Sequence, residues 1–373
     1  MSAYPTVPAE PQTKIPQLQS LLWDVFSISE THVREAPDQV VEFRGHMIQP
    51  PDQVQSTANT RFNDVGYTAL LSRDNDTDVL QAIAGVITPK PSQIWVNVLL
   101  LGLTIITTLM AGAELAGARF QSLDIFARHP EYLLMGLPFG GSLMLILGIH
   151  EMGHYVAGRI HKAAVTLPYF IPVPPFGALP LGTLGAFIQL RSPIQNRRAL
   201  FDIGLAGPIA GLIVAIGIYA FGLTVAQVIP SHGGISLGRS IFTEFLIGLI
   251  HPEALRAGYG VAINPFLLAG WFGLFVTVIN LLPIGQLDGG HILYSVLGRQ
   301  ARWFGLAAIV GLLALGQLTQ STTWTLWGFL GLLFGIRHSP PLDDVTILDP
   351  LRQIVAVATL IIFIAIFVPI PFR

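Results

Sequence analysis

The chain has 373 residues, of which 52% are hydrophobic and 11% are charged, and its formal net charge is −2. Soluble domains carry about 25% charged residues, so this composition excludes an ordinary soluble protein and indicates an integral, multi-pass membrane protein. The near-neutral charge does not favour a nucleic-acid partner. The absence of cysteine excludes disulfides and thiolate metal sites.

The N-terminal region is the polar part of the chain, because half of the acidic residues precede residue 80. Residues 1–38 begin with a Pro-rich segment, and we expect a flexible leader there with one short helix. Residues 39–90 are expected to form a small α/β domain. Its pattern predicts a strand, a helix and two further strands, at 39–48, 51–65, 67–73 and 79–87.

Residues 91–373 are expected to form a membrane-embedded domain, because apolar runs of about 20 residues recur along them. The predicted spans are 93–116, 132–159, 199–226, 263–284, 302–318, 322–337 and 351–370. The fifth and sixth are short, so they form either a hairpin or two full spans. The fold class is therefore an all-α polytopic protein with about 6–8 transmembrane helices. The distribution of lysine and arginine between the loops predicts a cytoplasmic N-terminus.

The apolar segment 163–192 contains several prolines, which forbid a continuous helix. Non-helical backbone at membrane depth persists only where protein buries it or where it lines a cavity. We expect a re-entrant, β-hairpin-like segment with an exposed edge strand at 184–190. The alternative is an ordinary cytoplasmic loop that rests on the membrane.

The sequence His150-Glu151-Met152-Gly153-His154 lies in one of these apolar stretches. An ionisable cluster inside a membrane segment is costly and indicates a functional site. Residues four apart share one face of a helix, so His150 and His154 can bind one zinc ion. Glu151 can accept a proton from the water that such an ion activates. Two buried, hydrogen-bonded histidines are the alternative interpretation.

A catalytic zinc ion requires a third protein ligand. Asp288 follows the fourth predicted span at its cytoplasmic end, and the histidine pair lies toward the cytoplasmic end of the second. Asp288 is therefore the expected third ligand. The alternatives are His161, which would need a helix break at Gly158, and His291 and Asp202.

Asn280 lies near Pro283 in the same segment as Asp288. An Asn side chain inside a membrane must find a partner. It either binds the substrate backbone or the oxyanion, as a catalytic group, or caps carbonyls that Pro283 leaves unpaired.

These elements together resemble the site-2 protease family of intramembrane zinc metalloproteases. The resemblance rests on the HEMGH segment, the Ala206-Gly207-Pro208 stretch and the segment from Asn280 through Asp288-Gly289, and it covers about residues 130–300. It implies one zinc ion held by His150, His154 and Asp288, with Glu151 activating the water. It also implies cleavage of transmembrane segments of single-span proteins, such as membrane-bound regulators, within lipid.

Two further stretches resemble the cyanobacterial and chloroplast branch of that family: Phe43-Arg44-Gly45, and 338–345 with the sequence HSPPLDDV. Gly45 is followed by His46, where that branch usually has Asn. The branch implies a bacterial plasma membrane or a thylakoid membrane. Two other functions remain as alternatives, a catalytically inactive relative that acts as a membrane chaperone or scaffold, and a zinc transporter.

Overall fold

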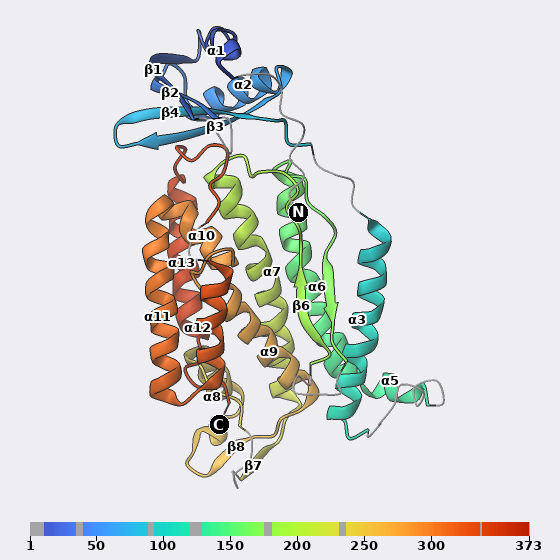
Figure 1. The fold of residues 1–373 in the computed structure, drawn as a ribbon. Coiled ribbons are helices and arrows are strands. Elements are labelled where there is room, and N and C mark those ends of the chain that lie inside the picture. The colour runs from blue at the N-terminus through green and yellow to red at the C-terminus, as the bar shows by residue number, and fades with distance from the viewer. Residues whose placement is uncertain are drawn as a thin grey trace.

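The computed structural model describes residues 11–34, 40–88, 93–118, 129–174, 181–230, 236–335 and 338–372. A small sheet domain lies at one end of a larger bundle of helices, and short strands lie at the opposite end (Figure 1). The predictions for residues 1–10, 35–39, 89–92 and 175–180 fall outside the described residues.

The N-terminal domain is a four-stranded antiparallel sheet in the order β1-β2-β4-β3, with α1 and α2 packed against it. The predicted strand, helix and two strands are confirmed with small shifts in their ends. The elements are α1 Pro11–Ser20, β1 Phe26–Arg34, β2 Val40–Met47, α2 Pro51–Asp64, β3 Tyr67–Asp74 and β4 Thr77–Ala84.

The prediction of a flexible leader is wrong for residues 26–34, which form β1 and pair along the whole of β2. The side chains of β1 alternate between partly and fully exposed positions after Phe26. An edge strand of this kind has no continuous apolar pattern. Its strand conformation comes from its hydrogen bonds to β2.

The remaining residues form a mainly helical bundle with two short two-stranded sheets, β5-β6 and β7-β8. Its elements are α3 Ile94–Leu115, α5 Glu131–Met135, α6 Leu137–Ile160, β5 Tyr169–Pro172, β6 Thr183–Phe187, α7 Arg197–Thr224, β7 Val228–Pro230, α8 Ile241–Ile250, β8 Tyr259–Val261, α9 Pro265–Asn280, α10 Asp288–Leu297, α11 Ala301–Thr319, α12 Thr322–Phe334 and α13 Pro350–Ile366. Of two short 3-10 turns, Pro252–Leu255 lies between α8 and β8, and Gly298–Gln300 joins α10 to α11.

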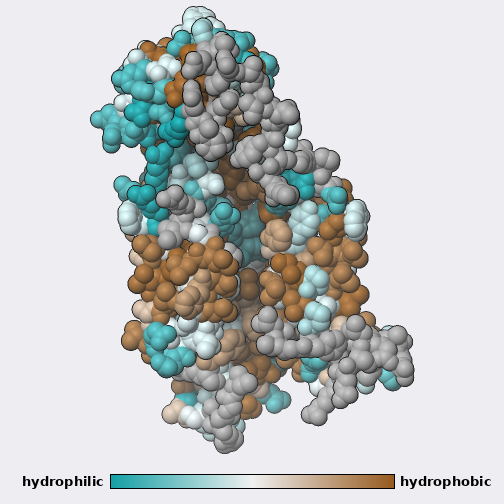
Figure 2. All heavy atoms as spheres, viewed as in Figure 1, coloured by the Kyte–Doolittle hydropathy of each residue, from teal (hydrophilic) through white to brown (hydrophobic). Residues whose placement is uncertain are grey.

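Within the described residues, three helical stretches are long and apolar enough to cross a membrane: Ile94–Leu115, Arg197–Thr224 and Asp288–Thr319. The predicted spans at 263–284 and 351–370 correspond to shorter apolar helices, α9 and α13. The span predicted at 132–159 is divided, because α5 ends at Met135 and α6 begins at Leu137. Hydrophobic side chains gather in a belt around the helical bundle on the face seen in Figure 2.

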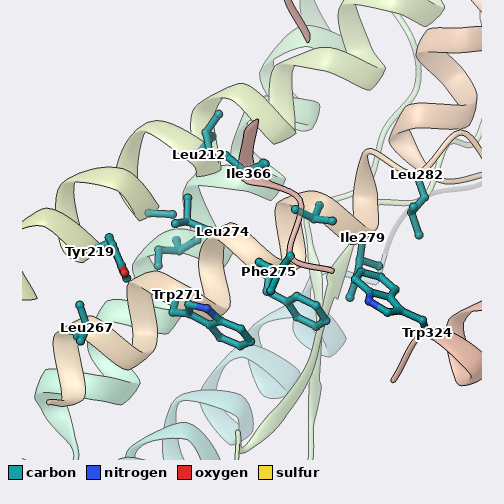
Figure 3. Packing of buried hydrophobic residues seen from close by; sticks show 14 of the residues in the cluster. Leu212, Tyr219, Leu267, Trp271, Leu274, Phe275, Ile279, Leu282, Trp324 and Ile366 are labelled. Atoms are coloured by element: carbon teal, nitrogen blue, oxygen red, sulfur yellow. The ribbon is translucent and has the colours of Figure 1, made fainter. Parts of the chain in front are cut away.

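The largest core lies around α9, whose side chains contact α7, α12 and the C-terminal residues. Trp271 and Phe275 stack with their ring centroids 5.3 Å apart. Figure 3 shows this packing, which includes Leu212, Tyr219, Leu267, Leu274, Ile279, Leu282, Trp324 and Ile366. The core holds α9 rigidly against α7, and both helices border the site described below.

The Pro-rich segment forms a β-hairpin, as predicted, because β5 pairs antiparallel with β6. Helix α3 supports this hairpin through two side chains. The amide of Asn97 donates to the carbonyls of Leu167 and Pro168 at 2.8 and 3.0 Å. The hydroxyl of Thr107 donates to the carbonyl of Gly182 at 2.6 Å. These bonds satisfy backbone oxygens that the prolines prevent from joining a helix.

A short extended segment, residues 342–344, joins the N-terminal domain to the bundle. The amide of Leu71 in β3 donates to the carbonyl of Leu342 at 2.7 Å, and the amide of Asp344 donates back to Leu71 at 2.9 Å. On its other side, Leu342 donates to the carbonyl of Ile194 at 2.9 Å. We call residues 342–344 the clamp segment, because it bonds to both parts at once.

Candidate metal centre

Helix α6 carries both histidines and Glu151 on its buried side. His150, Glu151 and His154 are each no more than 6% exposed. The two histidines are one turn apart, and their ring centroids are 4.8 Å from each other. The predicted pair on one helix face is therefore present in the fold.

Asp288 reaches the histidines from a different part of the chain. Helix α9 ends at Asn280, and after a short turn Asp288 is the first residue of α10. The turn is tight at Gly289, where a Cβ atom would lie 2.1 Å from the carbonyl oxygen of Leu281. Only glycine fits there. Asp288 supplies the carboxylate, and Gly289 lets the start of α10 lie close enough to Leu281 to position that carboxylate.

Three potential ligand atoms converge. The Nε2 atoms of His150 and His154 are 3.1 Å apart. Oδ2 of Asp288 lies 3.4 Å from His150 Nε2 and 3.3 Å from His154 Nε2. Ligands about 2.0–2.1 Å from a tetrahedral zinc ion are about 3.3 Å from one another. The triangle therefore fits zinc, and among the described residues these three are the group that can hold a metal ion.

The tautomer of His154 also fits metal binding. Its Nδ1 atom lies 2.7 Å from the carbonyl oxygen of Ile203 in α7. A carbonyl can only accept, so Nδ1 carries the proton and Nε2 keeps its lone pair toward His150 and Asp288. Metal-binding histidines usually have such a partner on the second ring nitrogen, which fixes the ring and raises its basicity.

Helix α7 approaches α6 closely because glycines face the histidines. A Cβ atom at Gly207 would lie 2.1 Å from Nε2 of His154, and one at Gly211 would lie 2.9 Å from the Cβ of His150. A larger side chain at either position would clash with a histidine, so the close approach of the two helices requires both glycines. Gly207 leaves the space that the His154 ring occupies.

Glu151 lies one residue round the helix from His150, and the backbone of Ile188 contacts its carboxyl group. Ile188 directly follows β6, so the end of the hairpin lies beside Glu151. A carboxylate buried beside a metal centre can accept and return a proton while the reacting groups stay out of bulk water.

Asn280, at the end of α9, faces the same centre. Its Nδ2 atom lies 3.3 Å from Nε2 of His150. The amide therefore lies against the ligand triangle, which is where the catalytic role considered for it would require it.

The alternative ligands are occupied elsewhere. Nε2 of His161 donates to Asp202 at 2.8 Å, and Arg352 also binds Asp202 through two nitrogens, at 2.8 and 2.6 Å. This ion-pair cluster ties α6, α7 and α13 together. His291 is not part of the ligand group, and its Nδ1 atom lies 2.5 Å from Nε2 of His338.

The contact between His291 and His338 is not apparent in the sequence. The two residues are 47 positions apart. His338 also stacks on Tyr294, with a centroid distance of 4.5 Å. His291 is a polar residue beside an apolar helix, which predicts a partner but does not identify it, and the polar sequence around His338 gives no such signal.

Comparison with known proteins agrees with this geometry. The model of peptidase family M50 matches residues 138–315. The "probable zinc metalloprotease EGY2, chloroplastic" of Arabidopsis thaliana is 30% identical over 251 residues, which are 65% of this chain and 43% of the relative. The corresponding EGY1 protein of Arabidopsis thaliana is 32% identical over 246 residues, 63% of this chain and 43% of the relative.

The EGY1 protein of Oryza sativa subsp. japonica is 31% identical over 243 residues, 63% of this chain and 41% of the relative. The chain thus spans less than half the length of these curated relatives. No solved structure matches. The matched range contains all three converging ligands together with Glu151. Residues 138–315 therefore form a peptidase family M50 domain, the site-2 protease type of zinc peptidase, and the chain is homologous to the chloroplast EGY zinc metalloproteases.

Proposed function

We propose that this chain is an intramembrane zinc endopeptidase that hydrolyses peptide bonds within or near transmembrane segments of other proteins. The observation that carries the proposal is the triangle of His150, His154 and Asp288, which is buried among apolar helices next to Glu151. Ionisable side chains buried among apolar helices are costly, so this cluster indicates a functional site, and its ligand set with an adjacent carboxylate suits hydrolysis.

The residues divide the chemistry between them. A bound zinc ion supplies a Lewis acid that polarises the scissile carbonyl and activates water. Glu151 accepts the proton from the attacking water and delivers it to the leaving amine. The Asn280 amide donates to the carbonyl oxygen as negative charge develops on it, because its Nδ2 atom already faces the centre.

The hairpin provides a way to present the substrate. A helical peptide bond is shielded by its own hydrogen bonds, so the substrate has to be extended at the cleavage point. Among the described residues, β6 pairs with β5 alone, and Leu184 and Phe187 on it are exposed. An unwound segment that adds to β6 as a third strand would run past Ile188 and reach Glu151.

We further propose a topology of six to eight spans, with the N-terminus in the cytoplasm of a bacterium or on the corresponding side of a thylakoid. Helices α3, α6, α7, α9, α11, α12 and α13 would be the spanning elements. In this arrangement residues 39–90 are a cytoplasmic domain and 91–373 the membrane domain, with its catalytic core in about 130–300. Single-span proteins, such as membrane-bound regulators, are the proposed substrates.

The first prediction concerns Glu151. A Glu151→Gln variant should cut a labelled transmembrane substrate at least about a hundredfold more slowly, because general acid–base catalysis contributes roughly 10²–10⁴ in rate. Its bound zinc, measured by elemental analysis of the purified protein, should be unchanged, since the three ligands remain. Phenanthroline should abolish cleavage by the unaltered chain.

Glu131→Gln is the matched control, because Glu131 is an exposed glutamate in α5 and should leave the rate unchanged. Full activity of Glu151→Gln, or cleavage that resists the chelator, would contradict the mechanism. Zinc binding without cleavage of any substrate helix would favour an inactive scaffold. A transporter would need further ligands along a path, and the described residues hold one such group.

A further inference from the structure

A separate cavity lies behind the turn that carries Asp288. Its volume is about 170 Å³, far above the ~10–15 Å³ that one water molecule needs. It is lined by Pro283 and Gly285 of the turn and by Gly290 and Tyr294 of α10. Residues at the junction of α10 with α11 and in the segment that begins at His338 also line it.

The cavity is positively charged. Arg299 and Arg302 supply this charge, and none of the described residues that line the cavity is acidic. Asp344 lies close by, but it accepts hydrogen bonds from Tyr294 at 3.0 Å and Arg197 at 2.8 Å. Its charge is therefore already paired.

The two arginines have no carboxylate partner among the described residues. Arg302 lies over the ring of its neighbour Trp303, with the guanidinium carbon 5.0 Å from the centroid, and Arg299 is exposed. A guanidinium presents a planar fork of N–H donors that matches the oxygens of a phosphate. Two such groups at one cavity mouth are suited to an oxyanion.

The surroundings indicate where the oxyanion comes from. Arg302 is the second residue of α11, within the stretch that is long and apolar enough to cross a membrane. Trp303 and Phe304 follow it and are 60% and 55% exposed. Exposed aromatic residues next to arginine at the start of an apolar helix are typical of the membrane surface, where anionic headgroups bind basic pockets between helices.

We propose that this cavity binds the phosphate group of an anionic lipid headgroup. Arg299 and Arg302 contact its oxygens, and Trp303 and Phe304 lie along its acyl chains. The bound headgroup rests against the 283–290 turn and so stabilises the position of Asp288. This site is distinct from the proteolytic reaction and does not depend on it.

Thermal unfolding of the purified full chain in mild detergent tests the proposal. Short-chain phosphatidylglycerol, short-chain phosphatidylcholine and inorganic phosphate are titrated separately. Phosphatidylglycerol should raise the melting temperature, and phosphatidylcholine should not. An Arg299→Gln/Arg302→Gln double variant should need at least about tenfold more phosphatidylglycerol for the same shift, equivalent to about 1.4 kcal/mol of binding free energy.

Arg159→Gln is the matched control, because Arg159 is an exposed arginine at the end of α6, away from the cavity lining. An Arg302→Lys variant retains the positive charge but lacks the planar set of guanidinium donors. Its loss of phosphatidylglycerol affinity should lie between those of the unaltered chain and the double variant. If inorganic phosphate matches phosphatidylglycerol at equal concentration, the site binds a soluble oxyanion and the lipid assignment is overturned. Equal shifts by both lipids, or equal losses in Arg159→Gln and the double variant, would overturn the site itself.

Discussion

At the scale of single residues, the metal centre depends on the orientation of the His154 and Asp288 side chains as well as on their chemical identity. His150 and His154 share a helix face because of their spacing. The Nδ1 contact of His154 with Ile203 and the position of Asp288 come from other helices. Ligand geometry therefore depends on small residues that let α7 and α10 approach α6.

Gly207 gives a sharp test of this dependence. Gly207→Ala would place a methyl group 2.1 Å from Nε2 of His154, and the ring cannot turn away without losing its bond to Ile203. Zinc affinity should fall by about 10–100-fold, as it does when residues that orient a ligand are altered. Competition with a fluorescent zinc chelator measures the change.

Gly217→Ala serves as the control for that experiment. Gly217 lies on the same helix, and a Cβ atom there would meet nothing within 4 Å. The control should bind zinc as the unaltered chain does. If both alanine variants bind zinc normally, the space at Gly207 is not required for the His154 ring.

At the scale of elements, the N-terminal sheet is supported by charged side chains outside its apolar core. Arg61 in α2 donates to both carboxylate oxygens of Asp24, at 2.5 and 2.9 Å, and to the carbonyl of Leu21 at 2.6 Å. These hydrogen bonds from Arg61 join α2 to the chain segment between α1 and β1. They hold the first strand at the edge of the sheet.

The pair makes the stability of this domain pH-dependent. The hydrogen bonds from Arg61 lower the pKa of Asp24 below its ordinary value near 4. A carboxyl group with a lowered pKa stabilises the fold above its unfolded pKa, and the contribution is lost as the pH falls through the folded value. Hydrogen exchange of β1 in the full chain should therefore become faster, after correction for intrinsic rates, below about pH 4.

Asp24→Asn should show weaker protection of β1 at pH 7 and a smaller change on acidification. Asp76→Asn, an exposed aspartate in the turn between β3 and β4, is the comparison. Identical pH profiles for Asp24→Asn and the unaltered chain would show that this pair does not support the strand.

At the scale of the whole molecule, the clamp segment joins the two parts of the chain. Asp344 is 7% exposed and binds Arg197 at the start of α7 and Tyr294 in α10. The same segment bonds to β3 through Leu71. The N-terminal domain is thus connected to the helices that carry the metal centre.

Asp344→Ala should release this connection. Removing one partner of a buried ion pair leaves the other charge uncompensated and costs about 3–5 kcal/mol. We expect a lower melting temperature and faster proteolytic cleavage between the N-terminal domain and α3, compared with the exposed-site variant Asp64→Ala. Equal cleavage rates in the two variants would mean that the N-terminal domain is held by other contacts.

The sequence by itself determined the elements whose physics is local. Apolar runs predict helices, alternation predicts β2, β3 and β4, and the four-residue spacing puts both histidines on one face. Asp288 was also predicted, because its place at a span end can be inferred from hydropathy. The span number could not be settled in this way, since α9 and α13 are shorter than a membrane crossing usually requires.

The tertiary structure decided whatever depends on partners distant in the chain. β1 is a strand because β2 pairs with it, His154 has its tautomer because Ile203 accepts from it, and Arg299 meets Arg302 and His338 around one cavity. Residues 342–344 join two domains through bonds to Leu71 and Ile194. Hydrogen bonds and close approaches of this kind depend on three-dimensional position, and no local pattern in the sequence encodes it.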